Sequence, residues 1–294
     1  MIMSNFTRLS LAEALSPRAL DELTSLRRAV PVIDASLANG GWICGGMMRH
    51  LLLDGSLEKY FAPQRDAEPF LPNTRDGDVD LFFPNVESAN RSASASNRKV
   101  TRSPANFAGE TRAVWDRRHE VKVQLVDNPD LVQPTIEDTL TRFDLTNCQV
   151  GTDGESVYLP EGWHDLESSR LLGIAHNNTP FLGCRILKYL EFRGLTGLTD
   201  DSYEKLQGWF AHAGNDFKGG EWNSNHISGV QGHVKRLRAA GLVRREDLIF
   251  FFNKWKKFVR EKSYGTTHYY EVDWALDELG ASAPYDLPNV ASDQ

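Results

Sequence analysis

The pattern of apolar residues changes near residue 165, and this change restricts the folds that the chain can adopt. Before it, segments such as 79–83 and 120–126 have strand patterns; in the second, apolar and polar residues alternate. After it, apolar residues recur at helical spacing, and glycines stand where several helices would end. We therefore predict an α+β fold, with a mixed-sheet head over residues 1–165 and an all-helical C-terminal domain over residues 166–294.

The same periodicity predicts the individual elements. Strands are expected at residues 79–83, 120–126, 143–151 and 156–159, the last two separated by a hairpin turn at 152–155. Helices are expected at residues 9–30, 47–60, 134–141, 181–193, 200–213, 227–240, 246–262 and 271–279. Residues 87–104 are rich in Ser, Asn and Arg and have almost no apolar side chains, so we expect a mobile surface loop there.

Composition is that of a globular protein. Of the 294 residues, 40% are hydrophobic and 25% are charged, which allows a sizeable core and excludes wholly disordered, collagen-like and coiled-coil chains. Apolar runs stay well short of the roughly 18 residues that a membrane-spanning helix needs. Residues 1–39 lack the basic start and apolar block of a secretory signal. We expect neither a membrane span nor secretion.

Charge and cysteine content narrow the partners and the compartment. The net charge of −7 and the pI of about 5.7 mean that a nucleic acid would have to bind a local basic patch. The three cysteines are far apart and form no CxxC pair, which argues against disulfides and zinc fingers and indicates a reducing compartment. We expect the cytoplasm. Cys44 has no histidine tied to it by sequence, so we interpret it as a small buried thiol.

The strongest chemical signal is Asp78-Val79-Asp80, which runs into an apolar strand. Residues two apart in a strand point to the same side, so both carboxylates face one way. They lie about 6–7 Å apart along the strand and repel each other unless a cation lies between them. A hard ion such as Mg²⁺, which takes oxygen ligands, fits this arrangement. The alternative is a solvated acidic turn. An EF-hand loop is excluded, because Leu81 occupies the position that needs glycine.

A second signal lies upstream, where Gly45-Gly46 precedes an expected helix that carries Arg49. Glycines let a backbone approach a phosphate closely, the amides at a helix start favour anions, and an arginine adds a fixed positive charge. A tight turn before a helix is the alternative. The combination with Asp78 and Asp80 about 30 residues later is more specific, because phosphoryl transfer needs both a phosphate site and a metal site.

Four segments carry, in order, a resemblance to a known family. Residues 44–55 (CGGMMRHLLLDG) and 76–83 (DGDVDLFF) resemble the head of the polymerase-β-type nucleotidyltransferases, in particular the bacterial-type CCA-adding enzymes and poly(A) polymerases. The corresponding family motifs read approximately GGxxRDxLLG and DxD. Residues 140–150 (LTRFDLTNCQV) are similar to the RRDLTINA-like segment of that family, and residues 184–195 (CRILKYLEFRGL) are similar to its RILRAARFAARLG-like helix.

The resemblance implies a five-stranded nucleotidyltransferase head and a helical body. It implies that Asp78 and Asp80 hold Mg²⁺ or Mn²⁺, with Glu120 as the candidate third catalytic carboxylate and Asp144 in reserve. It further implies a set of residues that bind the nucleoside triphosphate: Gly45, Gly46, Arg49, Arg142, Asp144, Arg185 and Lys188.

The chain also departs from the family pattern. His50 stands where the family has an aspartate, and Phe181 and Leu182 stand where CCA-adding enzymes carry an acidic pair that helps to read the incoming base. We therefore expect the addition of one kind of nucleotide, or loose discrimination, rather than an ordered CCA end. If neither Glu120 nor Asp144 serves as the third carboxylate, the head would bind nucleotide without efficient transfer.

The helical part contains a concentration of positive charge with aromatic residues among it. Basic groups and aromatics together suit an RNA backbone and its bases. We predict acceptor contacts from three lysines of this region: Lys254, Lys256 and Lys257. The alternative is a solvated helix face whose aromatic residues belong to the core.

Taken together, these features predict a metal-dependent nucleotidyltransferase whose acceptor is an RNA 3′ end, for example that of a tRNA. Two alternatives stay open: transfer of a nucleotide to a protein or small molecule, and a head that only binds nucleotide or RNA.

Overall fold

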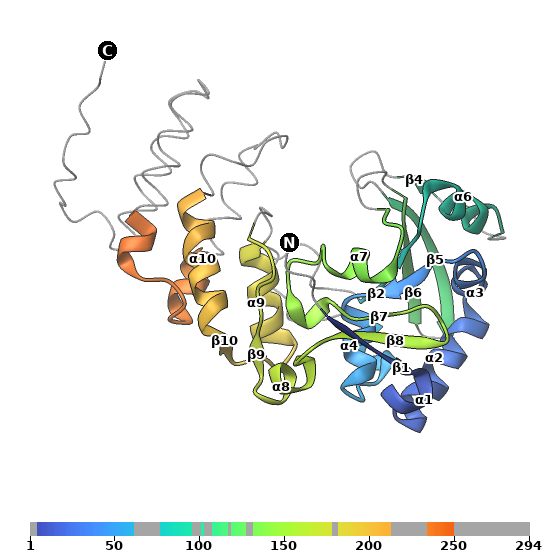
Figure 1. The fold of residues 1–294 in the computed structure, drawn as a ribbon, viewed down its shortest axis with the longest axis horizontal. Coiled ribbons are helices and arrows are strands. Elements are labelled where there is room, and N and C mark those ends of the chain that lie inside the picture. Colours follow the sequence, from blue (N-terminus) through green and yellow to red (C-terminus); the bar gives the residue numbers. More distant parts are fainter. Residues whose placement is uncertain are drawn as a thin grey trace, which may run out of the picture. The chain divides into compact units, whose positions relative to one another are not determined.

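The computed structural model describes residues 5–61, 77–95, 101–102, 108–116, 119–127, 132–177, 182–212 and 234–249. Contacts divide the chain into two compact units, whose elements are labelled in Figure 1. Unit 1 comprises Met1–His176 and Gly194–Thr199, and unit 2 comprises Asn177–Arg193 and Asp200–Gln294.

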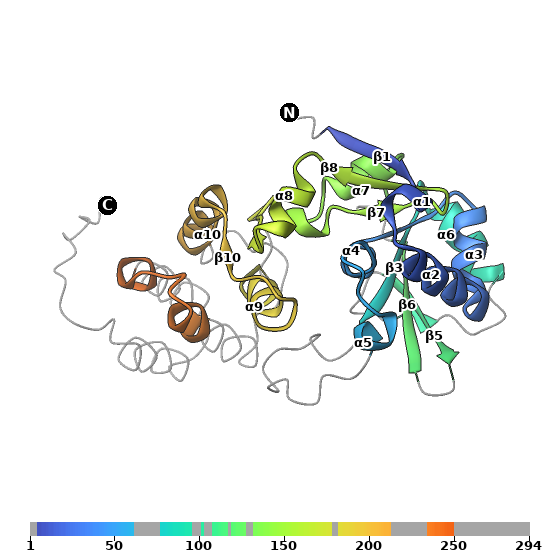
Figure 2. The same ribbon diagram turned by 90° about the horizontal axis from the view of Figure 1, so that it is seen from below.

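A mixed eight-stranded sheet is the frame of unit 1 (Figure 2). The strand order is β1-β8-β7-β2-β3-β6-β5-β4; β3 and β6 are parallel, and the other neighbouring pairs are antiparallel. The strands are β1 (Phe6–Ser10), β2 (Trp42–Cys44), β3 (Asp78–Phe82), β4 (Thr101–Arg102), β5 (Ala108–Asp116), β6 (His119–Val126), β7 (Gly151–Thr152) and β8 (Ser156–Pro160). The α+β class and the mixed sheet are confirmed, but the sheet has more strands than the five that the resemblance implied.

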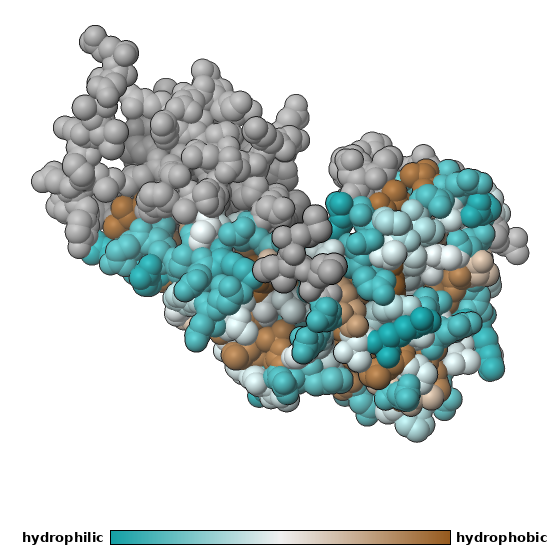
Figure 3. All heavy atoms as spheres, in the orientation of Figure 1, coloured by the Kyte–Doolittle hydropathy of each residue, from teal (hydrophilic) through white to brown (hydrophobic). Residues whose placement is uncertain are grey.

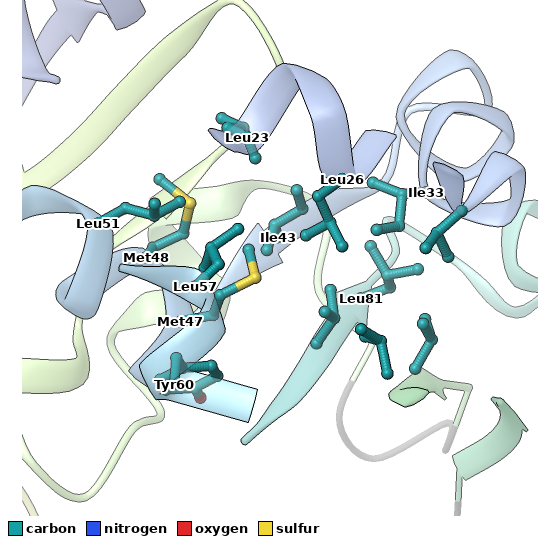
Figure 4. Close-up of a cluster of buried hydrophobic side chains, with 14 of the residues drawn as sticks. Leu23, Leu26, Ile33, Ile43, Met47, Met48, Leu51, Leu57, Tyr60 and Leu81 are labelled. Atoms are coloured by element: carbon teal, nitrogen blue, oxygen red, sulfur yellow. The ribbon is translucent and has the colours of Figure 1, made fainter. Parts of the chain in front are cut away.

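The main core of unit 1 joins helices to one face of the central strands. Val79 and Leu81 of β3 and Val121 and Val123 of β6 are fully buried in it, as the alternation of polar and apolar residues predicts. Figure 4 shows Leu81 of this set beside leucine, isoleucine and methionine side chains from the helices. The helices that contribute are α2 (Pro17–Ala29), α3 (Pro31–Ala38), α4 (Gly46–Leu52), α5 (Leu57–Phe61) and α6 (Val86–Ala95).

A smaller cluster occupies the opposite face of β2. Trp42 and Cys44 of β2 pack there with Tyr158 of β8 and with the helix α7 (Ile136–Leu140), close to the predicted 134–141. Trp42 is paired with Phe82 across the strands, and Cys44 is paired with Asp80. Because directly paired residues share a face, the acidic pair of β3 lies on this second face of the sheet.

Two predicted helices are wrong in extent. Residues 9–30 form the end of β1, the short helix α1 (Leu11–Ala14) and α2. The reason is local: Ser10 caps α1 in a capping box with Glu13, and Ser16 caps α2, which begins at Pro17. Residues 47–60 are divided between α4 and α5, because Asp54 takes a left-handed conformation with φ of 55° in the turn between them.

Two further predictions were wrong. A polar segment expected to be a loop forms a helix, and a segment expected to be a strand forms a 3₁₀ turn. Residues 86–95 form α6 rather than a mobile loop; Ser88 and Ser92 are buried, and the Ser92 hydroxyl donates to the Ser88 carbonyl at 2.9 Å. The predicted strand at 143–151 is instead a 3₁₀ turn, η1 (Thr146–Cys148), followed by β7. The expected strand at 156–159 and the turn before it are confirmed as β8 and its hairpin with β7.

The remaining described part of unit 1 is α8 (Trp163–Ser168) and a two-stranded parallel sheet of β9 (Leu171–Leu172) and β10 (Gly197–Leu198). In unit 2 the described elements are helices: α9 (Leu182–Phe192), α10 (Asp200–His212) and the stretches 234–239 and 245–249. The first two confirm predicted helices, and α9 is followed by Gly194 at φ 78°, as expected for a helix end. The expected helix at 271–279 lies outside the described residues.

The surface of the described residues is mostly hydrophilic in the view of Figure 3, with scattered hydrophobic patches. Within the described ranges, none of the helices combines the length and the apolar character needed to cross a membrane.

Candidate active site

The acidic pair lies where the strand pattern predicts. In β3, Asp78 and Asp80 are half-buried, whereas Val79 and Leu81 between and after them are fully buried. The two carboxylates therefore share one face of the strand, and the apolar residues anchor the other face in the main core. The predicted placement of both carboxylates is confirmed.

The neighbouring strands determine what faces this pair. On β2, Cys44 is paired with Asp80. On β6, Lys122 is paired with Asp78 and Gln124 with Asp80. With the Gln124 amide oriented to satisfy both neighbours, its nitrogen donates to Asp80 Oδ1 at 3.1 Å and its oxygen accepts from Lys122 Nζ at 2.5 Å. A polar row thus runs from β3 to β6 on the second face of the sheet.

The interpretation of Cys44 as a small buried thiol is confirmed. Its side chain is 1% exposed. Burial, and secondarily the nearby Asp80 carboxylate, raise the pKa of the thiol well above its usual value. The group is therefore held as a neutral thiol rather than activated as a thiolate nucleophile.

Gly45 connects β2 to α4 in a conformation that requires glycine. Its φ is 87°, and its amide donates to the Val150 carbonyl at 2.8 Å. A Cβ on Gly45 would lie 2.9 Å from Cε1 of Phe143. The backbone at this turn is therefore packed directly against the segment that follows α7. Gly46, the first residue of α4, is half-buried.

The segment of residues 142–144 lies beside the acidic strand. The Phe143 ring packs on the ring of Phe82, with centroids 5.4 Å apart, and also against Gly45. Arg142 is exposed, whereas Asp144 is 6% exposed and its carbonyl accepts from the amides of Ala175 and His176. The structure thus brings together three of the four segments noted in the sequence: the glycine turn, the acidic strand and residues 142–144.

Arg49 has a buried ionic partner that the sequence did not indicate. Its Nε and Nη2 donate to Oε1 and Oε2 of Glu167, each at 2.6 Å, and both side chains are 4% exposed. The Asn147 amide also donates to Glu167 Oε1, at 2.8 Å. This bidentate pair joins α4 to α8 across 118 positions of sequence. The role of Arg49 in binding a phosphate stays a prediction.

The other predicted site residues are placed as follows. Glu120 lies in β6, where its backbone pairs with Val114, but its side chain lies outside what the structure describes. On α9 of unit 2, Arg185 is exposed and Lys188 is half-buried. Phe181 and the three lysines of the basic tail, Lys254, Lys256 and Lys257, fall outside the described ranges.

The donor set suits a hard cation that is bound by few protein ligands. Among the described residues no group of three or more His, Cys, Asp or Glu side chains could hold a metal ion. Asp78 and Asp80 supply carboxylate oxygens on one side of β3, and Mg²⁺ is typically held by one or two carboxylates with phosphates and waters completing its shell. The residues therefore fit such an ion in the presence of a polyphosphate.

Comparison with known structures shows similarity to CCA-adding enzymes. The complex of a CCA-adding enzyme with CTP aligns at a TM-score of 0.47 and 12% identity, over 88% of this chain and 72% of that one. The complex with ATP aligns at 0.47 and 13%, over 93% and 68%. The Thermotoga maritima CCA-adding enzyme complexed with tRNA aligns at 0.40 and 12%, over 88% and 68%. No protein-family model and no curated protein matches the chain.

Proposed function

We propose that the chain is a metal-dependent nucleotidyltransferase, which moves a nucleoside monophosphate from a nucleoside triphosphate to a hydroxyl acceptor. The observation that carries the proposal is the placement of Asp78 and Asp80 on one face of β3, beside the Gly45 turn and the segment of Arg142. Paired carboxylates bind a hard cation, and an exposed arginine binds phosphate oxygens. Phosphoryl-group transfer depends on both features within one site.

Asp78 and Asp80 are the proposed ligands of Mg²⁺, or of Mn²⁺ in its place. Bound there with the nucleotide, the cation would neutralise charge on the phosphates and on the departing pyrophosphate. The contribution of the chain is to direct both carboxylates to one side, which the pleat of β3 does. Glu120, which lies two residues before Lys122 in the sequence of β6, is the proposed third catalytic carboxylate.

The proposed nucleotide contacts are the residues that the sequence resemblance indicated. Unit 1 offers the backbone of Gly45 and Gly46, the Arg142 guanidinium and Asp144, with Arg49 held within α4 by Glu167. Arg185 and Lys188 of α9 keep the nucleotide-binding role that the sequence predicts, and both are at least partly accessible. Arginine and lysine both suit triphosphate oxygens, arginine with two directed donors and lysine as a point charge.

Leu182 supports the expected loss of CCA-type base selection. It stands where CCA-adding enzymes carry one of two acidic base-reading residues, and here it is fully buried. A buried leucine offers no hydrogen bond to a base edge. We therefore propose addition of one kind of nucleotide, or loose discrimination, in place of an ordered C, C, A sequence.

The proposed acceptor is the 3′ end of an RNA such as a tRNA. The basis is the basic and aromatic composition of the helical region, with Lys254, Lys256 and Lys257 as proposed phosphate contacts. In this arrangement the predicted head of residues 1–165, which lies within unit 1, carries catalysis, and unit 2, which contains most of the predicted helical domain of residues 166–294, binds the acceptor.

One observation favours a second candidate, a head that binds nucleotide but transfers it poorly. The two β6 residues paired with the acidic pair are Lys122 and Gln124, so neither position directly opposite Asp78 or Asp80 is a carboxylate. Activation of an attacking hydroxyl normally uses a positioned base in reach of the metal. Catalysis then depends on Glu120, which lies two residues before Lys122 in β6.

The deciding experiment incubates the protein with each labelled nucleoside triphosphate, Mg²⁺ and total cellular RNA. Products are separated on a denaturing gel, the protein is analysed by intact mass, and released pyrophosphate is measured in parallel. Label on RNA supports the proposal, and label on the protein indicates a protein acceptor. Pyrophosphate release that does not need RNA indicates a small-molecule acceptor. Nucleotide binding with no pyrophosphate release from any mixture would refute transfer and leave the binding function.

A further inference from the structure

A lysine of the neighbouring strand is paired directly with one residue of the acidic pair. β3 and β6 are parallel, and the register pairs Lys122 with Asp78. Neighbouring strands are about 4.8 Å apart, so paired side chains on one face are close. Val121 and Val123 on either side of Lys122 are fully buried, which directs the lysine to the face of the acidic pair.

Hydrogen bonds connect this lysine to the acidic pair through one side chain. With the Gln124 amide in the orientation that satisfies both neighbours, Lys122 Nζ donates to the Gln124 carboxamide oxygen at 2.5 Å, and the Gln124 nitrogen donates to Asp80 Oδ1 at 3.1 Å. Gln124 is thereby oriented from both ends: its oxygen faces the ammonium and its nitrogen faces the carboxylate. The ammonium is consequently part of the polar row that contains both proposed metal ligands.

We propose that Lys122 is the counter-charge of the Asp78–Asp80 pair, and that it sets how tightly the free protein binds a divalent cation. The proposal rests on the metal-dependent function proposed above. Two carboxylates on one face repel each other, and a fixed ammonium beside them offsets that repulsion without a metal. A divalent cation that enters the site is in turn repelled by the ammonium. The protein without nucleotide therefore binds the metal ion weakly, and the negative triphosphate is needed to hold the cation in place.

The size of the effect follows from the charges. A single and a double positive charge about 6 Å apart in a largely aqueous site repel each other enough to weaken cation affinity about tenfold. Removal of the ammonium should recover that factor. A carboxylate in the same position should tighten binding further, because it adds both a negative charge and an oxygen ligand opposite Asp78.

The test measures Mn²⁺ binding to the full chain without nucleotide, by the electron paramagnetic resonance signal of free Mn²⁺. We expect Lys122→Met to bind Mn²⁺ about tenfold more tightly than the wild type, and Lys122→Glu more tightly still. Lys122→Arg keeps the charge and should stay within about twofold of the wild type, which separates the charge from a packing role. The matched control is Lys59→Met, which removes an exposed lysine of α5.

The outcomes separate this inference from the function on which it rests. Circular dichroism identifies any variant that fails to fold, and Asp78→Asn should weaken Mn²⁺ binding in every background. Metal affinity that is unchanged or weaker in folded Lys122→Met, while Asp78→Asn still lowers it, would overturn the role of Lys122 alone. The absence of Mn²⁺ binding in the wild type and in all Lys122 variants would overturn the metal site and the inference together.

Discussion

The buried pair of Arg49 and Glu167 allows a quantitative prediction. Both side chains are 4% exposed and joined by two hydrogen bonds of 2.6 Å, so removal of either partner leaves a charge in the core without its counter-ion. Loss of one member of such a pair costs about 3–5 kcal/mol. We expect Arg49→Met and Glu167→Met each to lower the free energy of unfolding of unit 1 by about that amount.

The double variant tests whether the pair itself is the cause. With both charges gone and similar volume retained, most of the lost stability should return, since hydrophobic replacements of a buried ion pair are often close to neutral. The measurement is urea unfolding of the wild type, both single variants and the double variant, which gives the interaction free energy as a double-mutant cycle. Additive losses, or a single-variant loss below about 1 kcal/mol, would refute the reasoning.

The same variants decide what Arg49 does. The sequence pattern predicts that it binds a phosphate, and the structure shows its guanidinium held by Glu167. If its role is to fix α4 against α8, the double variant, with its stability recovered, should bind a nucleoside triphosphate with nearly wild-type affinity. If it contacts the nucleotide, affinity should fall in Arg49→Met and in the double variant alike, whereas Glu167→Met would lose stability but keep the contact.

The other predictions concern transfer, specificity, pH and the acceptor. Asp78→Asn or Asp80→Asn should abolish nucleotide transfer while the melting temperature stays equal or rises slightly, because like-charge repulsion falls; near-normal activity of both would refute the metal assignment. On a tRNA that lacks its 3′ end, sequencing of the products should show one kind of nucleotide added, and ordered C, C, A addition would contradict this. Burial and a hydrogen bond to Asp153 raise the pKa of Tyr158 to about 12 from its ordinary 10. The unfolded chain therefore loses this proton first, so the free energy of unfolding should decrease as the pH rises from 10 to 12, and less steeply in Tyr158→Phe. Charge reversal of the three proposed acceptor contacts should weaken RNA binding and flatten its log–log salt dependence by about one unit per lost phosphate contact, with nucleotide affinity unchanged; the lysines are Lys254, Lys256 and Lys257.

The acidic strand could be predicted because its signal is local. Alternation places Asp78 and Asp80 on one side and Val79 and Leu81 on the other, and nothing beyond the segment is needed to see it. The α+β class follows in the same way from many such segments. α6 was missed for a local reason too. Its buried serines look like loop residues in the sequence, yet the Ser92 hydroxyl bonds to a carbonyl of its own helix, which removes the cost of burying it.

The contacts that define the site join segments that are far apart in the sequence, so the sequence of one segment does not predict them. The pairing of Lys122 with Asp78 depends on the register of two parallel strands about 40 positions apart, and a shift of one residue would turn the lysine to the opposite face. The sequence of neither strand specifies that register. The alternation of polar and apolar residues shows only that the polar positions of β6 are a glutamate, a lysine and a glutamine.

The partner of Arg49 also could not be predicted from the sequence motif. A glycine pair followed by an arginine predicts a charged residue near a phosphate, because the motif specifies a residue type and its spacing along the chain. It does not specify where the guanidinium points. The ionic partner comes from α8, 118 positions later, and Asn147 of η1 shares the same carboxylate. An arginine in this motif can pair with a buried carboxylate or bind a phosphate, and the motif alone is compatible with both interpretations. The distinction is physical: an arginine that stabilises the turn can be replaced together with its partner, whereas an arginine that binds substrate cannot.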